Sequence, residues 1–238
     1  MTPPRDTASR EDDNALPARI ARTLIERIVT GKLRPGERVG QDTLAAEFGA
    51  SHVPVREAFR RVEARGLLVS EPRKGVRVSS LDEGSIVEIT CLRGALEPLA
   101  LRTAMPAVTE GDLARAKAAI EAGTRARGMQ EWEAANRAFH ESLYKPCAMP
   151  RLLAMIDMLH ESRMRYMHAT ASYVAWDPNS QREHQQLLAA VRKGDVERAC
   201  CLLEKHIHGA GKMLVQGLAK WHSTVSARKD SGCTLKRS

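Results

Sequence analysis

Apolar residues recur at helical spacing in three segments near the start of the chain. The first segment follows Pro17, which suits the first turn of a helix, and Gly31 ends it. A second, shorter segment ends at Gly49, and Ser51 is placed to cap a third segment that stops at Gly66. The predicted buried faces are Ile20, Leu24, Ile28 and Val29, then Leu44, Ala45 and Phe48, then Val55, Ala58, Phe59 and Val62.

The pattern changes from helix to strand after the third segment. Residues 67–69 and 76–78 are rich in Leu and Val, and a polar turn of residues 71–75 lies between them. Such alternation, flanked by glycine and proline, predicts a small β-hairpin. Three helices with a glycine-containing turn before the third, followed by a hairpin wing, are the element order of a winged helix-turn-helix.

Beyond residue 80 the strand signals disappear and helical patterns follow one another. Three of these patterns begin with a recognisable cap, namely Asp82, Thr109 with Asp112 three residues later, and Asp195. The expected helices span residues 82–105, 109–122, 129–145, 151–171, 178–193 and 195–222. Their short connections predict an antiparallel six-helix bundle, so the expected fold class is mainly α.

The charge of the chain is unevenly distributed. Of the net charge of +8, residues 16–80 contribute +6, from thirteen basic and seven acidic side chains, whereas residues 81–222 contribute only +1. This division suggests a polyanion-binding module joined to a domain with a different partner, although a merely soluble basic surface would give the same charge. Together with the winged helix-turn-helix pattern, it predicts a DNA-binding domain over residues 16–80 and a helical domain over residues 81–222. We expect the polar N-terminus, residues 1–15, to be disordered and the basic tail, residues 223–238, to be flexible.

Composition argues against a membrane or secreted protein. The chain has no apolar run approaching the roughly 18 residues that a bilayer span needs, and its charged N-terminus is unlike a signal peptide. An odd number of cysteines without a C-x-x-C motif favours reduced thiols in the core of a cytoplasmic protein. The five cysteines are Cys91, Cys147, Cys200, Cys201 and Cys233.

The start of the third predicted helix is the leading candidate for reading DNA. A helix in the major groove presents its first turn to the base edges and its basic side chains to phosphates. Arg56 is the best candidate, because its planar guanidinium can bond guanine or a phosphate with two hydrogen bonds. Arg60 and its neighbour Arg61 have an alternative, an ion pair with an acidic residue on the helix surface. The candidate contacts on this helix are Ser51, His52, Pro54, Arg56 and Arg60.

The tip of the predicted hairpin offers two further DNA contacts. Lys74 supplies a cation that can displace counterions from the phosphate backbone, and Gly75 allows close approach of the main chain. The alternative interpretation is an ordinary solvated turn.

Three histidines of the helical domain share an inward direction. His140 follows Asn136 by four residues on one helix face, and His184 and His206 each lie within an apolar pattern. Buried imidazoles need either hydrogen-bonding partners or a metal ion, and the sequence pattern leaves both open. The other histidines of this domain are expected at the surface or at its boundary, namely His160, His168, His208 and His222.

Three motifs in the N-terminal domain carry a resemblance to a known family. They are Leu33-Arg34-Pro35-Gly36-Glu37-Arg38, Leu44-Ala45-Ala46-Glu47-Phe48-Gly49 and Pro54-Val55-Arg56-Glu57-Ala58. With these motifs, residues 20–78 resemble the winged helix of the GntR family of bacterial transcription regulators. The family usually has Ser-Arg-Thr-Pro where this chain has His52 and Val53 between Ser51 and Pro54, so we expect a different operator sequence.

The helical domain carries motifs of its own. They are Leu92-Arg93-Gly94-Ala95-Leu96-Glu97, Asn136-Arg137-Ala138-Phe139-His140, Glu183-His184 with Gly194-Asp195, and Lys205-His206-Ile207. These motifs are similar to those of the FCD ligand-binding domain of FadR-like GntR regulators, and six helices resemble its VanR-type branch. The resemblance implies a divalent metal, zinc before nickel or manganese, held by Asn136, His140, His184 and His206. Many relatives have Asp in place of Asn136, which implies weaker metal retention here.

Four neutral ligands leave the charge of a divalent cation uncompensated in a helical bundle, so a small carboxylate is the expected effector. The resemblance places Arg93 where the family often clamps an effector carboxylate, although Arg93 can instead pair with Glu97 one turn later. Arg163 and Arg165 are further candidates, of which we expect only one to face inward.

Together these features predict a DNA-binding transcription regulator, acting as a repressor, that binds a palindromic operator as a homodimer and responds to the carboxylate. One alternative is a DNA-binding regulator whose bundle is purely structural. A metal-dependent hydrolase is a weaker alternative, because neither Glu141 nor Glu183 is on a face that obviously converges with the histidines and no H-E-x-x-H motif is present. We therefore expect no enzymatic activity and no membrane partner.

Overall fold

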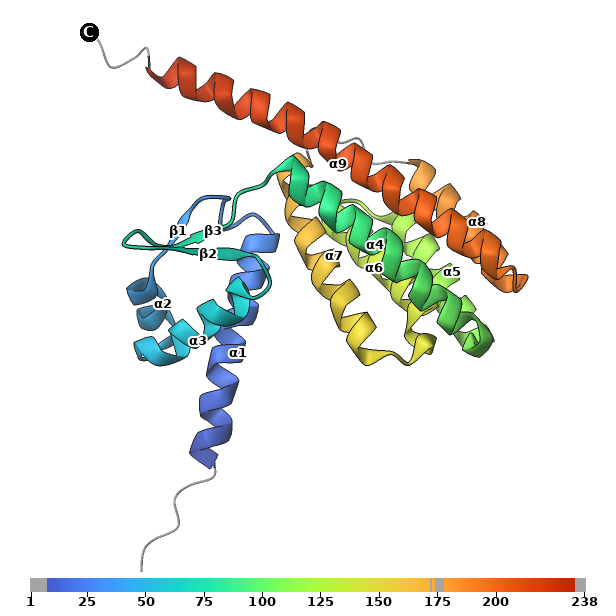
Figure 1. Cartoon of the computed structure of the whole chain (residues 1–238), viewed down its shortest axis with the longest axis horizontal. Helices are drawn as coiled ribbons and strands as arrows, with labels where there is room; N and C mark the ends of the chain where they lie inside the picture. The colour runs from blue at the N-terminus through green and yellow to red at the C-terminus, as the bar shows by residue number, and fades with distance from the viewer. Residues whose placement is uncertain (1–7, 172, 174–177, 234–238) are drawn as a thin grey trace, which may run out of the picture. The chain divides into compact units, whose positions relative to one another are not determined.

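The computed structural model describes residues 8–171, 173 and 178–233 and divides into two compact units (Figure 1). The first unit ends at Leu81 and the second begins at Asp82, one residue beyond the expected boundary. The first unit is helical with a small sheet and the second is a helical bundle, which confirms the predicted fold class.

From residue 8 onward, the first unit has three helices and three short strands. Its apolar core joins the three helices to the sheet through side chains such as Ile20, Val55 and Val78. In chain order the elements are α1 (Ala8–Val29), β1 (Arg38–Val39), α2 (Gln41–Phe48), α3 (His52–Glu63), β2 (Leu68–Glu71) and β3 (Gly75–Val78).

The sheet contains the predicted hairpin and one strand that the sequence did not predict. Strand β3 lies between β1 and β2 and pairs antiparallel with both, with Leu68 opposite Val78 and Arg38 opposite Arg77. The positive φ of Arg73 (65°) and Gly75 (86°) turns the chain between β2 and β3. Strand β1 has only two residues, too few to show an alternating pattern.

Helix α1 begins at Ala8, before the start predicted at Pro17, and residues 1–7 lie outside the described residues, so the expected disorder of residues 1–15 stays a prediction. One expectation about the first unit is corrected. Ser51 stands at the N-cap position of α3, but its side chain makes no capping hydrogen bond.

Within the described residues, the second unit contains six α-helices, as predicted, and two single-turn 3-10 helices, η1 (Met105–Ala107) and η2 (Lys145–Cys147). Asp82 and Asp195 cap their helices by accepting the backbone N–H of Ser85 and Arg198. The helices are α4 (Glu83–Ala104), α5 (Glu110–Arg125), α6 (Met129–Tyr144), α7 (Pro150–Thr170), α8 (Pro178–Arg192) and α9 (Val196–Cys233). Helix α9 continues past the expected end at His222, so residues 223–233 are helical, and residues 234–238 lie outside the described residues.

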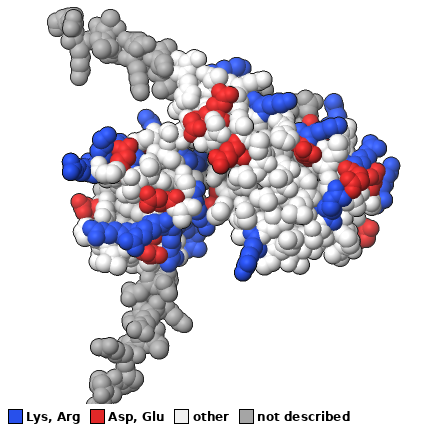
Figure 2. Space-filling model, viewed as in Figure 1, with Lys and Arg blue, Asp and Glu red and all other residues white. Residues whose placement is uncertain are grey.

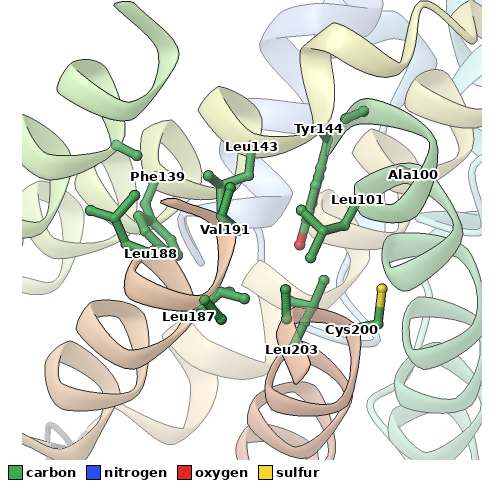
Figure 3. Close-up of a cluster of buried hydrophobic side chains, with 14 of the residues drawn as sticks. Ala100, Leu101, Phe139, Leu143, Tyr144, Leu187, Leu188, Val191, Cys200 and Leu203 are labelled. Carbon is green, nitrogen blue, oxygen red and sulfur yellow. The ribbon is translucent and has the colours of Figure 1, made fainter. Parts of the chain in front are cut away.

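The core of the bundle contains side chains from all six helices α4 to α9. Phe139 and Leu143 from α6 meet Leu187 from α8 and Leu203 from α9 (Figure 3). These four side chains are almost fully buried, so each contributes roughly 1.5–3 kcal/mol of transfer free energy. The packing holds the faces of α6, α8 and α9 that carry the three inward histidines.

The capping box of α5 provides a stability prediction. Thr109 Oγ1 accepts the backbone N–H of Asp112 at 3.2 Å, and the Asp112 carboxylate accepts the backbone N–H of Thr109 at 2.9 Å. Because Thr109→Ala removes the side-chain cap, it should lower the free energy of unfolding by about 1 kcal/mol in urea denaturation. Thr103→Ala is the control, because exposed Thr103 lies inside α4 and caps no helix; equal losses in both variants would contradict the assigned cap.

Candidate functional site

Helix α3, the predicted recognition helix, presents an exposed arginine that contacts a side chain of α2. Arg56 is exposed, and its Nε lies 3.5 Å from Oε1 of Gln41, the first residue of α2. The Gln41 amide also donates to the backbone oxygen of His52 at 3.3 Å. Gln41 therefore links the first turn of α2 to the first turn of α3 and orients Arg56 without burying its guanidinium.

The other predicted DNA contacts are also accessible. Arg60 is exposed on the next turn of α3, whereas Arg61 donates to Glu57 at 3.1 Å, so the alternative ion pair applies to Arg61. Figure 2 shows many Lys and Arg side chains on the visible face of this unit. Ser51, His52, Lys74 and Gly75 are exposed and Pro54 is half-buried.

Three imidazoles meet inside the second unit. His140 on α6, His184 on α8 and His206 on α9 are buried, and one nitrogen of each lies within 4.8 Å of the other two. The Nε2 atoms of His184 and His206 are 3.3 Å apart. Asn136, one turn before His140, is buried and lines a cavity together with His140 and His206. These are the four residues that the resemblance implied as metal ligands.

The environment keeps the rings of His140 and His184 neutral. Burial, followed by the neighbouring imidazole of His184, holds the pKa of His140 well below its usual value. Burial and the proximity of His206 lower the pKa of His184 to about 2. Neutral imidazoles with available lone pairs are the form that binds metal ions.

Hydrogen bonds determine which nitrogen of His140 faces the other rings. Tyr144 donates its hydroxyl proton to Glu97 Oε2 at 2.6 Å, so its oxygen accepts from His140 Nδ1, 2.9 Å away. The lone pair of His140 is therefore on Nε2, which is buried without a partner among the described residues. Burying an acceptor without a partner costs folding free energy unless a cation or a hydrogen-bond donor binds to it.

The rings of His206 and His184 are held by a hydrogen bond and by ring stacking, respectively. His206 Nδ1 donates to Glu183 Oε2 at 2.7 Å, which directs the His206 Nε2 lone pair toward His184. The ring of His184 stacks on Phe139, with centroids 4.2 Å apart. Two imidazole nitrogens bound to one ion, each about 2.1 Å from it, are about 3.0 Å apart in octahedral geometry and about 3.4 Å apart in tetrahedral geometry. The 3.3 Å between Nε2 of His184 and Nε2 of His206 therefore fits a shared ion.

A buried carboxylate supports this arrangement from α4. Burial opposes ionisation of Glu97, but Arg93 and His160 overcome that effect and hold the pKa of Glu97 well below its usual value. Arg93 Nε donates to Glu97 at 2.6 Å and both side chains are buried. Of the two roles left open for Arg93, the ion pair with Glu97 is therefore present, and the side chain also lines the cavity.

The histidine cluster opens onto a cavity of about 290 Å³. Arg163 lines this cavity and is paired with Glu133, whereas Arg165 is buried near Asp82 and does not line it. Cavities of this size hold small molecules. Apolar walls come from Met129, Trp132, Met167, Met213 and Leu214.

Two expectations about the site are wrong. His160 is buried and its Nε2 lies 3.4 Å from Glu97 Oε1, so it is not a surface residue; it continues the buried positions Leu152 and Ile156 of α7 at four-residue spacing. Glu183 does converge on the histidines, through His206. Sequence reasoning missed Tyr144 altogether, because only the packing of α4 against α6 brings its hydroxyl to Glu97.

A winged helix with an exposed arginine on its recognition helix, joined to a bundle around a buried histidine cluster, defines a two-domain DNA-binding protein. Residues 16–78 match the family described as bacterial regulatory proteins, gntR family, and residues 88–209 match the FCD domain. The chain belongs to the GntR family of bacterial transcription regulators and carries an FCD domain. It is a DNA-binding transcription regulator and not an enzyme.

Named relatives are similar along most of the chain. The probable D-xylose utilization operon transcriptional repressor of Paenarthrobacter nicotinovorans is 30% identical and aligns over 84% of this chain and 89% of its own length. The transcriptional regulator McbR of Escherichia coli K12 is 31% identical, over 80% of this chain and 89% of its own. A solved structure of E. coli McbR/YncC has a TM-score of 0.70, with 26% identity, and covers 88% of this chain and 98% of its own.

Among the described residues, none of the helices has the length and apolar character required to cross a bilayer.

Proposed function

We propose that this regulator is a homodimeric repressor that acts in the cytoplasm, binds a palindromic operator and is controlled by a small carboxylate bound at a divalent metal in the helical unit. The buried cluster of His140, His184 and His206, two of which (His140 and His206) line a cavity, carries this proposal. Three relatives bear the name of repressor, which supports the same role here. A reporter that carries an operator selected with the purified chain tests the role, because deleting the gene for this chain should raise expression of the reporter.

The metal would be held by Asn136, His140, His184 and His206. A set of three imidazoles and one amide suits zinc, with nickel or manganese as alternatives. When bound, the ion supplies positive charge that attracts an anionic ligand to an open coordination position. Tyr144 orients the ring of His140, and Glu183 orients the ring of His206. Glu97 in turn accepts a hydrogen bond from the Tyr144 hydroxyl and fixes its position.

The effector would lie in the cavity beside the histidines. Arg93 and Arg163 line this cavity and are the cationic side chains that an acid would approach. Each guanidinium is already paired with a carboxylate, which leaves the metal as the main uncompensated charge for the acid. The unpartnered His140 Nε2 argues against a purely structural bundle, because such a bundle would gain stability from an apolar side chain at this position.

One face of the helical unit suits a second copy of the chain. Helices α4 and α7 pack against each other, and large apolar side chains remain exposed on both. Figure 2 shows that the visible face of the described helical unit has few charged side chains where α4 and α7 lie in Figure 1. Exposed apolar patches with an uncharged centre are typical of protein interfaces. The exposed residues are Val87, Leu92, Leu99, Met155 and Met158.

Introducing charge on this face should separate the dimer. Leu92→Lys buries an unpaired ammonium at the proposed interface, so we expect the protein to sediment as a monomer at micromolar concentration in analytical ultracentrifugation. Val69→Lys is the control, because Val69 is a similarly exposed apolar residue on β2 of the other unit. A Leu92→Lys protein that remains dimeric would contradict the proposed interface.

The acid would control DNA binding by favouring one arrangement of the dimer. A ligand shifts such an equilibrium only by its different affinities for the two arrangements. Because one winged helix reads a single half-site, a change in the spacing of the two heads changes the affinity for a palindrome.

A further inference from the structure

The cavity beside the histidines contains a second group of polar atoms that lack partners. Arg163 Nε and Ser180 Oγ are both buried without a hydrogen-bonding partner among the described residues, and both side chains line the cavity. Arg163 and Ser180 are each 5% exposed. Two buried donors without acceptors are unfavourable by roughly 1–3 kcal/mol each, unless a ligand supplies the acceptor.

These donors lie some distance from the imidazoles along the helices. Ser180 is one turn before His184 on α8, or about 6 Å along the axis at 1.5 Å per residue. Arg163 pairs with Glu133, which is seven residues before His140 on α6, or about 10 Å along that axis. A ligand that reaches both the imidazoles and this second group must therefore be a molecule of moderate length.

The charge at this second group selects the kind of oxygen that can bind. Arg163 donates to Glu133 Oε1, and its Nη1 lies 2.9 Å from the sulfur of Met167. The guanidinium charge is thus neutralised by a buried carboxylate, so a second carboxylate of the ligand would remain uncompensated. A hydroxyl or carbonyl oxygen can accept from Arg163 Nε and Ser180 Oγ without that cost.

We propose that the effector is a monocarboxylic acid whose far end carries an uncharged hydroxyl or carbonyl group, held by Arg163 and Ser180, with an apolar middle against Trp132 and Met213. This inference rests on the proposed function, because it takes the acid end to bind at the metal centre. A cavity of 290 Å³ is roughly twice the volume that holds one benzene ring, which agrees with a ligand of this length.

Calorimetric titration of the zinc-loaded full chain with matched linear acids tests the inference. Each chain length of about four to eight carbons is tried as the plain acid, the terminal hydroxy acid and the diacid. The best hydroxy acid should bind about tenfold more tightly than its plain and diacid counterparts. Equal binding of the three forms would overturn the inference while leaving the proposed carboxylate effector intact, whereas the absence of any acid binding would contradict the proposed function itself.

Two variants test whether Arg163 and Ser180 cause the preference for the hydroxy acid. Ser180→Ala removes one donor with little risk to folding, and the double variant Glu133→Met with Arg163→Met removes the ion pair without leaving a buried charge. Both should bind the hydroxy acid and the plain acid about equally, and both should keep the zinc content of the wild type. A preference that survives in both folded variants would overturn the assignment to Arg163 and Ser180.

An independent observation on the recognition helix supports a second inference. Val53 is 75% exposed in the first turn of α3, the largest exposed fraction among the exposed large hydrophobic side chains of the described residues. It does not belong to the core of its unit. The apolar feature that a first-turn side chain meets in the major groove is the C5-methyl group of thymine. We infer that Val53 contacts a thymine methyl in each half-site.

Replacing thymine by uracil tests this contact, because uracil lacks only the methyl group. An operator is selected with the full chain from randomised duplex DNA, and each thymine is then replaced in turn. At one symmetric pair of positions the substitution should weaken binding about fourfold per half-site, and Val53→Ala should be insensitive there. Val69→Ala, on β2, is the control that should retain the sensitivity. Full sensitivity in Val53→Ala, or no sensitive position in the wild type, would overturn this inference, whereas failure to select any DNA would contradict the family assignment.

Discussion

Arg56→Ala is expected to weaken operator binding by about tenfold to a hundredfold in a fluorescence anisotropy titration. Arg56 is the exposed arginine in the first turns of α3 that Gln41 holds by its Nε atom. Its guanidinium therefore approaches the groove already oriented, and little side-chain entropy is lost on binding. If Arg56 bonds a base, selectivity for the operator over random DNA falls together with affinity. If it bonds a phosphate, both affinities fall and the salt dependence becomes shallower by about one unit of slope.

Arg61→Ala is the matched control on the same helix. Arg61 is partly buried and pairs with Glu57, so its loss should change operator affinity far less. Equal effects of the two substitutions would show that total charge, and not the placement of Arg56, governs binding. An unchanged affinity and salt slope in Arg56→Ala would contradict the assignment of α3 as the recognition helix.

Replacing His140 and His184 together by alanine should abolish stabilisation by zinc. A ligand that binds only the folded state stabilises it by about 4 kcal/mol at a thousand times its dissociation constant, so the wild type should melt several degrees higher with zinc than after chelation. The double variant lacks two of the three imidazoles whose nitrogens meet within 4.8 Å. The informative quantity is the zinc-dependent shift in melting temperature, because the substitutions also remove buried side chains and change the baseline stability.

His208→Ala serves as the control for nonspecific zinc effects. The His208 side chain is 43% exposed and lies 3.9 Å from Glu204, away from the cluster. This variant should keep the full zinc shift and the zinc content measured by elemental analysis. A shift that persists in the His140 and His184 double variant would contradict the metal centre.

Much of the fold follows from local signals that the sequence displays directly. The caps at Asp82, Thr109 and Asp195 and the glycine after α2 mark element boundaries without reference to the rest of the chain. The errors lie where such signals are weak. Strand β1 exists because Arg38 and Val39 pair with β3, and no local pattern in two residues announces such a pairing.

The site was predictable in part for a similar reason. His140, His184 and His206 lie in apolar helical patterns, so their inward direction could be inferred from periodicity. Their supporting partners could not, because the Tyr144 hydroxyl meets Glu97 across 47 residues of sequence. The burial of His160 could have been inferred, because it follows the buried Leu152 and Ile156 at four-residue spacing. The prediction of a surface position failed because the polar character of histidine was given more weight than this spacing.

The central claim is that an acid bound at the metal centre controls operator binding. The most direct measurement is the operator affinity of the full chain by anisotropy, with and without the tightest-binding acid of the matched series, in the zinc-loaded and the chelated state. We predict that the acid weakens operator binding at least tenfold in the zinc-loaded protein and has no effect after chelation, which is a coupling free energy of about 1.4 kcal/mol or more. An operator affinity that the acid leaves unchanged in the zinc-loaded protein, or changes equally in both states, would contradict the account.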